Sequence, residues 1–497
     1  MTLTFKPKNG YVGDPIPFYW KGEYHVFYIK APKDSTGFGR LKAGWDHILS
    51  RDLFSWRELP TALEIGDNSE PDADGVWTGS VYEHDGVFHI FYTGFNSNNK
   101  YQQAICHATS IDLIEWEKDP SNPIIYPDEK WYEPNDWRDP VIFWNQKEQQ
   151  FWMLIVARLN KGPKVRRGCI ALSTSADLKK WTVQGPFWAP YNTFCMECPD
   201  IFKLGNKWYL LYSRFSEKTQ TVYRVSDNPN GPWRICSNEA IDGRRLYAAR
   251  TAGDNNRRIA FGFINNRNGD NENGCWEWGG NLCIPRELVP NTNGGLDIKC
   301  PSEIVNRSYS SIDYNFESKI GEWRNNGSSI SVSDTDGFTY GLFQHINEKN
   351  ILLEINVTLD KRTKSSGVFV RTESELTSGY LVRLEPNWHR VILEKWPEPM
   401  DRYYELNTYY KNILYGANTP KAEFREPIVE RPLAINPDRP INIKIFITGD
   451  ITEVFVDDKV SLTYRTYSPK EYVLGLFAEG GACKFDNIKI KETNISK

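Results

Sequence analysis

The chain has 497 residues, enough for two typical domains, and its 60 basic and 64 acidic side chains give a formal net charge of −4. No basic tract stands out, so nucleic acid is not an expected partner. No apolar run approaches the ~20 residues of a membrane span, and no membrane partner is expected.

The first predicted unit opens with an acidic motif, Gly13-Asp14-Pro15, and continues after a glycine turn into the aromatic run YHVFY at residues 24–28. Its third strand ends at the segment SRDLFSW, residues 50–56. Apolar and polar side chains alternate in several of these runs, and no long stretch has helical periodicity. This pattern predicts short antiparallel strands.

Four further units follow with the same order of motifs. Their openings lie at residues 77–80 (WTGS), 137–140 (WRDP), 196–200 (MECPD) and 247–250 (YAAR). Their closing segments lie at residues 110–116 (SIDLIEW), 175–181 (SADLKKW) and, more loosely, 226–233. The closing segment recurs after 60, 65 and 51 residues, a spacing that fits four short strands a unit. We therefore predict a five-bladed β-propeller, in which the first strand of each blade lines the central channel.

The closing segments contain Asp52, Asp112 and Asp177, each followed four residues later by a tryptophan. An aspartate at this place in a turn accepts hydrogen bonds from backbone amides, and a tryptophan at a strand edge packs against its neighbours. We predict structural roles for these residues, with the tryptophans lying between blades.

The pattern changes after about residue 305. Alternating strands continue, for example at residues 351–357, 367–371 and 451–457, without the closing segment. Evenly spaced strands of this kind predict a β-sandwich. The predicted organisation is all-β, with a propeller over residues 1–305 and a sandwich over residues 306–497 that serves packing or ancillary sugar binding.

Three of the openings carry the acidic residues Asp14, Asp139 and Glu197. Equivalent positions in separate blades face one another at one mouth of the channel, so we expect these carboxylates to converge. Converging carboxylates can cleave a glycosidic bond, and this chemistry needs neither a metal nor a cofactor.

Cysteine usage bears on the cellular location. The nine cysteines are scattered, and the lone CxxC at residues 195–198 has no second pair, so a zinc site is not expected. Residues 1–8 also lack the apolar core of a signal peptide. We expect reduced thiols in a cytoplasmic protein, with a secreted form lacking its signal sequence as the open alternative.

The three acidic motifs, in this order, resemble those of glycoside hydrolase family 32, the invertases, inulinases and levanases. The residues YHVFY after the first motif, WTGS at 77–80 and WGGNLCIPREL at 278–288 also resemble stretches of that family. The resemblance covers the first three hundred residues and implies a five-bladed propeller followed by a β-sandwich. It also implies retaining hydrolysis through a covalent glycosyl-enzyme.

The resemblance implies one role for each acid. Asp14 would be the nucleophile, and Glu197 would protonate the leaving oxygen and later deprotonate water. Asp139 would stay ionised, bind hydroxyls of the sugar ring and stabilise its positive charge.

The chain also departs from the family pattern around its first motif. The family has asparagine where this chain has Gly13, and glutamine where it has Ile29; in relatives both residues hold fructosyl hydroxyls. Specificity for a furanoside other than fructose therefore stays open.

Around the mouth we place residues that lie at or near strand openings: Trp45, Asp46, Trp77, Thr78, Asp136 and Trp137. Of these we take Trp45, Asp46, Trp77 and Thr78 as substrate-binding residues, together with Arg138. Trp77 is either a stacking platform for the sugar or a residue that packs between blades. Arg138 should point away from Asp139 by strand alternation, either to bind substrate or to form a structural ion pair.

Three functions compete. The leading one is an exo-acting retaining β-fructofuranosidase that cleaves sucrose, inulin- or levan-type fructans. The second is an arabinofuranosidase- or xylosidase-type hydrolase of the related five-bladed group, and the third is a carbohydrate-binding protein without catalysis. The sequence leaves open the linkage, exo or endo action, transglycosylation, the role of the sandwich and the oligomeric state, with a homodimer as one option.

Overall fold

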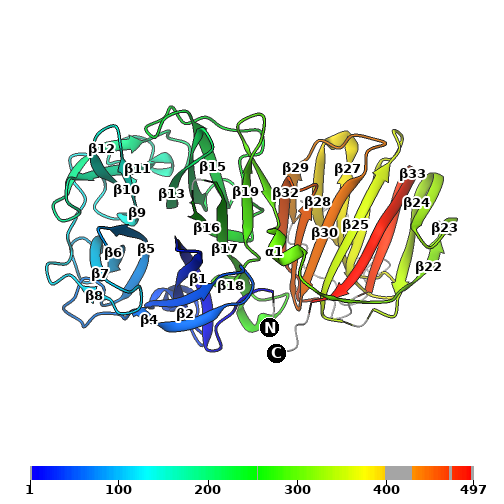
Figure 1. Cartoon of the computed structure of the whole chain (residues 1–497), viewed down its shortest axis with the longest axis horizontal. Helices are drawn as coiled ribbons and strands as arrows, with labels where there is room; N and C mark the ends of the chain where they lie inside the picture. Colours follow the sequence, from blue (N-terminus) through cyan, green and yellow to red (C-terminus); the bar gives the residue numbers. More distant parts are fainter. Residues whose placement is uncertain (1–2, 255, 347, 398–427, 469–472, 494–497) are drawn as a thin grey trace, which may run out of the picture. The chain divides into compact units, whose positions relative to one another are not determined.

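The computed structural model describes residues 3–254, 256–346, 348–397, 428–468 and 473–493. They form two compact units, the first ending at Ser308 and the second beginning at Tyr309 (Figure 1). None of the helices within these ranges is long and apolar enough to cross a membrane.

The first unit is a five-bladed β-propeller. Blade 1 contains β1 (Gly10–Trp20), β2 (Glu23–Pro32), β3 (Trp45–Ser50) and β4 (Arg57–Leu63), and blade 2 contains β5 (Gly75–His84), β6 (Val87–Phe95), β7 (Gln103–Ser110) and β8 (Glu117–Lys118). Blade 3 contains β9 (Arg138–Asn145), β10 (Gln150–Arg158), β11 (Gly168–Ser175) and β12 (Thr182–Trp188), and blade 4 contains β13 (Glu197–Leu204), β14 (Lys207–Arg214) and β15 (Gln220–Ser226). Blade 5 contains β16 (Leu246–Gly253), β17 (Arg258–Arg267), β18 (Trp276–Leu282), β19 (Arg286–Pro290) and β20 (Leu296–Lys299). The short helices of this unit are η1 (Gly37–Leu41), η2 (Lys164–Arg166), η3 (Asn268–Asp270) and α1 (Ser302–Val305).

The five inner strands, β1, β5, β9, β13 and β16, surround the centre of this unit in Figure 1. Blade 5 closes the ring because β18 pairs with both β17 and β1, in the latter case at Val12↔Gly280. The Leu282 amide also donates to the Phe5 carbonyl at 2.9 Å, which ties the N-terminal segment to the last blade. The two ends of the propeller are thereby joined in one hydrogen-bonded sheet.

The closing segments have the predicted structural role. In each, the aspartate accepts two backbone N–H groups: Phe54 and Ser55 on Asp52, Ile114 and Glu115 on Asp112, and Lys179 and Lys180 on Asp177. Trp116 packs edge-on against Phe27, and Trp181 packs edge-on against Phe91, so each indole touches the preceding blade. The prediction that these tryptophans lie between blades is confirmed.

The second unit is the β-sandwich. Its strands are β21 (Ser310–Ser311), β22 (Asn315–Ile320), β23 (Trp323–Asn325), β24 (Ser329–Gln344), β25 (Asn350–Leu359), β26 (Ser365–Thr372), β27 (Gly379–Glu385), β28 (Arg390–Trp396), β29 (Val429–Pro432), β30 (Ile441–Thr448), β31 (Ile451–Val456), β32 (Val460–Arg465) and β33 (Val473–Glu492), with the short helix η4 (Pro386–Trp388). The long strand β33 pairs with β26 through its first half and with β25 through its second half. Gly480 and Gly481, with φ of 60° and 94°, interrupt it between those halves, a conformation that glycine adopts without a steric penalty.

Candidate active site

Each inner strand of the propeller has an irregularity at the same level. The register of its hairpin shifts between Val12 and Pro15 in β1, between Trp77 and Gly79 in β5, and between Glu197 and Asp200 in β13. Equivalent shifts lie in β16, after Tyr247, and in β9, after Arg138. A bulge re-aims the side chains of its strand, so five bulges at one level direct five sets of side chains toward a common centre.

Three of the bulges contain a residue other than glycine in the left-handed region. These are Asp139, Cys198 and Ala248, with φ of 55°, 50° and 51°. This conformation is uncommon for such residues and persists only where the surrounding structure enforces it. Strained backbone is therefore present at the level of the acidic motifs, as it also is at Leu53, Leu113 and Leu178 in the closing segments.

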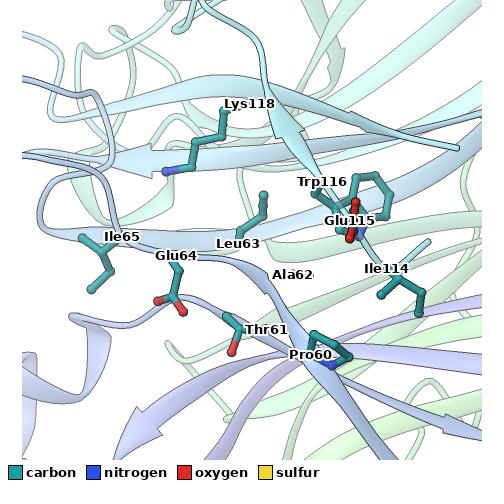
Figure 2. A pocket seen from close by; sticks show the side chains of 10 residues that line it. All are labelled: Pro60, Thr61, Ala62, Leu63, Glu64, Ile65, Ile114, Glu115, Trp116 and Lys118. Carbon is teal, nitrogen blue, oxygen red and sulfur yellow. The ribbon is translucent and has the colours of Figure 1, made fainter. Parts of the chain in front are cut away.

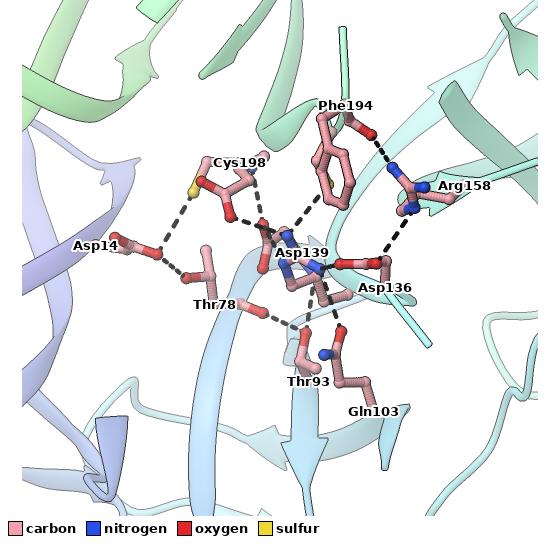
Figure 3. Close-up of polar contacts among 12 residues, drawn as sticks. Asp14, Thr78, Thr93, Gln103, Asp136, Asp139, Arg158, Phe194 and Cys198 are labelled. Atoms are coloured by element: carbon pink, nitrogen blue, oxygen red, sulfur yellow. Dashed lines mark hydrogen bonds and ion pairs between the residues drawn. The ribbon is translucent and has the colours of Figure 1, made fainter. Parts of the chain in front are cut away.

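Asp14 is held by donors from three other strands, of which Figure 3 shows those of Thr78 and Cys198. Its Oδ2 accepts the Thr78 hydroxyl at 2.6 Å and lies 3.5 Å from the Cys198 Sγ donor, and its Oδ1 accepts the Trp278 indole Nε1–H at 3.0 Å. Burial raises the pKa of the Asp14 carboxyl above its usual value, and the negative charge of Glu197 adds to the rise, while these hydrogen bonds oppose it.

Glu197 has two strong donors. Arg138 Nη2 donates to its Oε1 at 2.8 Å, and the Tyr247 hydroxyl donates to its Oε2 at 2.6 Å. Each carboxylate oxygen therefore has a partner from a different blade, β9 and β16, which fixes the orientation of the Glu197 side chain.

Asp139 is buried, with 3% of its surface exposed, and its Oδ2 accepts the Cys198 amide at 2.9 Å. Burial raises its pKa to about 7; the Arg138 guanidinium opposes that rise, and the charges of Asp14 and Glu197 add to it. With such a pKa, the protonated and ionised forms are both populated near neutral pH. That Asp139 is ionised beside a bound sugar stays a prediction.

Arg138 lies among the acids. It donates to Asp136 at 2.6 Å as well as to Glu197, and its Nε lies 3.8 Å from Asp139 Oδ2. The prediction that Arg138 points away from Asp139 is wrong, because the left-handed backbone of Asp139 breaks the strand alternation on which it was based. Arg138 therefore connects two of the three acids.

Of the other residues predicted at the mouth of the channel, some contact the acids and some do not. Thr78 contacts Asp14, as described above. Trp45 is fully buried, and its Nε1 donates to the Trp77 carbonyl, so its placement at the mouth is wrong: the large indole fills the core between blades 1 and 2. The placement of Trp137 at the mouth is wrong for the same reason, since its indole is fully buried in a core cluster. The Trp77 indole donates to the Leu41 carbonyl at 3.0 Å and stacks on Phe95.

Asp46 lies on the third strand of blade 1, where it pairs with Lys30 at 2.7 Å and Thr61 at 2.9 Å. These contacts do not join Asp46 or Trp77 to the acids, and their roles as sugar contacts stay predictions.

Sequence reasoning missed three residues that contact the carboxylate groups of the acids: Cys198, Tyr247 and Trp278. Two of these three could have been recognised from their positions in the sequence motifs. Cys198 follows Glu197 directly, and Tyr247 occupies the opening of the fifth unit, the place that holds acids in other units. Nothing in the sequence shows that Trp278 returns to Asp14 from 264 positions away.

A separate cavity of about 500 Å³ lies between the outer parts of blades 1 and 2 (Figure 2). Its lining residues run from Pro60 to Ile65 and include Ile114, Glu115, Trp116 and Lys118, and none of the three acids is among them. Within the described ranges, no three His, Cys, Asp or Glu side chains are grouped so that they could hold a metal ion.

Two family models match the chain over most of its length. The model of the glycosyl hydrolases family 32 N-terminal domain matches residues 4–298, and the family 32 C-terminal model matches residues 319–492. The chain belongs to glycosyl hydrolase family 32. The resemblance predicted from the three acidic motifs is thereby confirmed.

Curated relatives in this family include an insoluble β-fructofuranosidase isoenzyme of Arabidopsis thaliana, 29% identical over 358 residues, which are 64% of this chain and 62% of the relative. A sucrose-6-phosphate hydrolase of Zymomonas mobilis is 29% identical over 308 residues, 57% of this chain and 58% of the relative. The matched part of this chain thus spans about three fifths of each relative's length.

Solved structures show the same fold over almost the whole chain. A sucrose-6-phosphate hydrolase from Lactobacillus gasseri has a TM-score of 0.72 at 18% identity and covers 99% of this chain and 93% of its own. An exo-inulinase from Aspergillus awamori has a TM-score of 0.72 at 19% identity and covers 99% of this chain and 98% of its own. The predicted propeller and sandwich are confirmed.

Proposed function

We propose that this family 32 protein is a retaining glycoside hydrolase that cleaves terminal β-fructofuranosides such as sucrose and inulin- or levan-type fructans. The observation that carries the proposal is the contact network that joins Asp14, Asp139 and Glu197 from blades 1, 3 and 4. Three carboxylates around one centre meet the needs of an oxocarbenium-like transition state.

In the first half of the proposed reaction, an oxygen of the Asp14 carboxylate attacks the anomeric carbon. The bond from that carbon to the leaving oxygen breaks, and Glu197 gives its proton to that oxygen. Hydrogen bonds from Thr78 and Trp278 favour the ionised form of Asp14 that the attack requires. The products are the leaving sugar and a glycosyl ester of Asp14.

In the second half, the ionised Glu197 removes a proton from water, and the resulting hydroxide attacks the anomeric carbon and releases Asp14. Arg138 and Tyr247 keep the Glu197 carboxyl in one orientation through both halves. Two displacements at the same carbon return the original anomeric configuration.

Asp139 would contact hydroxyls of the bound ring and stabilise the positive charge that develops on it. Burial raises the pKa of Asp139 to about 7, and a cation that develops nearby lowers it and so favours the ionised form. The charge of Asp139 thus responds to the reaction.

Fructosides are the proposed substrates because the names of the curated relatives above specify fructosyl or sucrose-type bonds. One observation favours the second candidate, an arabinofuranosidase- or xylosidase-type hydrolase. Ile29 is 1% exposed and packs in the core between blades 1 and 2, and Gly13 has no side chain, so neither can hold a sugar hydroxyl.

We assign the chemistry to residues 1–305 and propose that the sandwich, residues 306–497, has no catalytic part. We also propose a cytoplasmic location, since the buried cysteines Cys106, Cys169, Cys195 and Cys198 are free thiols, which suits a reducing compartment.

The test is a substrate screen with sucrose, inulin, levan, aryl α-arabinofuranosides and aryl β-xylosides, in which the released monosaccharide is identified and its first anomer is followed by NMR. Release of fructose with retention supports the proposal, and release of a pentose supports the second candidate. An inverted product would rule out Asp14 as a nucleophile, and the Asp14→Ala protein serves as the blank.

A further inference from the structure

Gly13, directly before Asp14, is glycine because of space and not because of backbone conformation. Its φ is outside the left-handed region, so an L-residue could adopt its backbone there. A Cβ at this position, however, would lie 2.2 Å from Cη2 and 2.5 Å from Cζ2 of Trp278, and 2.9 Å from the Ile29 carbonyl oxygen. Real Cβ atoms essentially never come within 3.0 Å of another heavy atom, so the Trp278 indole occupies the space of a side chain at position 13.

The position of Trp278 is fixed from its own strand as well. Arg40, 2% exposed, donates to the Trp278 carbonyl at 2.9 Å and to Asn266 Oδ1 at 2.7 Å. The indole also packs edge-on against Phe263, with ring centroids 5.9 Å apart. The backbone of Trp278 and its indole ring are therefore both fixed in place where the ring meets Gly13.

From this position the indole reaches the Asp14 carboxylate. Its Nε1–H donates to Oδ1, whereas Thr78 and Cys198 donate to Oδ2. Donors on both oxygens prevent the carboxylate from rotating about its Cβ–Cγ bond. Without Trp278, Oδ1 would lose its donor, and the remaining two would hold one oxygen only.

We propose that Gly13 and Trp278 act as one positioning unit for Asp14: the missing Cβ admits the indole, and the indole N–H orients the carboxylate for attack. This inference rests on the proposed function in treating Asp14 as a nucleophile. Trp278 acts here through Asp14, and it takes the space that an asparagine at position 13 would occupy.

Loss of this positioning unit should change the pKa of Asp14, which loss of an ordinary packing contact would not do. A donor to the charged form of a carboxyl lowers its pKa, so loss of the Trp278 N–H raises the pKa of Asp14 further above its usual value. It also leaves the attacking group less well oriented, which lowers kcat more than it changes KM.

The experiment compares Trp278→Phe and Gly13→Ala with the wild type, and uses Trp276→Phe as the matched control. Phenylalanine at position 278 keeps an aromatic wall and removes the N–H. Trp276 is on the same strand, and its indole packs on Arg245 and Arg267. Thermal unfolding midpoints are recorded for all variants.

The first readout does not need turnover. A water-soluble carbodiimide with an amine nucleophile labels protonated carboxyls, and mass spectrometry of the Asp14 peptide across pH gives the midpoint of labelling. In Trp278→Phe we expect this midpoint to rise by about half to one pH unit, in Gly13→Ala to rise likewise, and in Trp276→Phe to stay at the wild-type value.

The second readout is steady-state kinetics on whichever glycoside the wild type cleaves. We expect kcat of Trp278→Phe to fall about 10-fold to 100-fold with little change in KM, and the acid limb of the kcat/KM profile to move to higher pH. An unchanged labelling midpoint in Trp278→Phe overturns the inference whether or not the protein cleaves sugars. A raised KM with unchanged kcat also overturns it, because Trp278 would then bind the sugar and not orient Asp14. If no glycoside is cleaved, the proposed function fails and the labelling midpoints alone decide the inference.

Discussion

Two sets of acidic residues recur from blade to blade, one at the inner bulges and one at the outer turns. The outer aspartates, such as Asp112 and Asp177, accept two backbone amides each, and these hydrogen bonds lower their pKa. The inner acids Asp14 and Asp139 are buried near one another, and burial raises their pKa. The fold thus favours the ionised form of the aspartates at the outer turns and disfavours the ionised form of those at the inner bulges.

This contrast separates structural from functional acids without reference to relatives. A carboxylate whose charge is balanced by hydrogen bonds within the fold adds stability. A carboxylate whose ionised form is disfavoured by burial is available to a ligand or to a reaction. Four substitutions test whether the contrast holds, and they follow from the largest expected effect to the smallest.

Asp14→Ala should lower kcat by at least about 10 000-fold, because it removes the attacking oxygen. The thermal unfolding midpoint should stay the same or rise, since a carboxyl with a raised pKa is lost. Rates on sucrose or another cleaved glycoside and a melting curve measure both. A rate within tenfold of the wild type would exclude Asp14 as the nucleophile.

Glu197→Gln should depend on the leaving group. Natural glycosides need protonation of the leaving oxygen and should lose about 1000-fold or more in kcat/KM, whereas aryl glycosides with acidic phenols should lose far less. The glutamine keeps acceptor capacity for Arg138 or Tyr247, so folding should be preserved. Equal losses on both substrates would remove Glu197 from the acid role.

The arrangement of strands could be predicted from the sequence because it repeats. Five openings and the recurring turn segment give the blades, and equivalent positions in inner strands give the convergence of Asp14, Asp139 and Glu197. The predictions that failed depended on a single backbone angle or on how deeply one side chain is buried. The left-handed φ of Asp139 turned Arg138 toward the acids, and full burial placed Trp45 in the core.

Asp139→Asn should stabilise the protein in a pH-dependent manner. Burial raises the folded-state pKa of Asp139 from its usual 3.8 to about 7, so its contribution to stability is fully present below about pH 4 and is lost as the pH rises through 7. Asparagine has no such loss and can still accept the Cys198 amide. We expect a gain of about 1–3 kcal/mol at pH 8 that disappears toward pH 4, measured by denaturant unfolding; a gain of the same size at both pH values would contradict a buried, titrating Asp139.

Asp177→Ala should change the stability in the opposite direction, by a smaller amount. The Asp177 carboxylate accepts the amides of Lys179 and Lys180 at 2.9 Å each, and its pKa is lowered by these bonds from 3.8. Its contribution to stability is therefore present above about pH 4 and is lost as the pH falls below it. We expect a cost of about 1 kcal/mol at pH 7, by analogy with the loss of a side-chain cap, with kcat and KM unchanged. Plotted against pH, the stability differences of Asp139→Asn and Asp177→Ala should have opposite signs at pH 7 to 8. If Asp177→Ala instead lowered kcat with its unfolding midpoint unchanged, the separation between outer structural acids and inner functional acids would not hold.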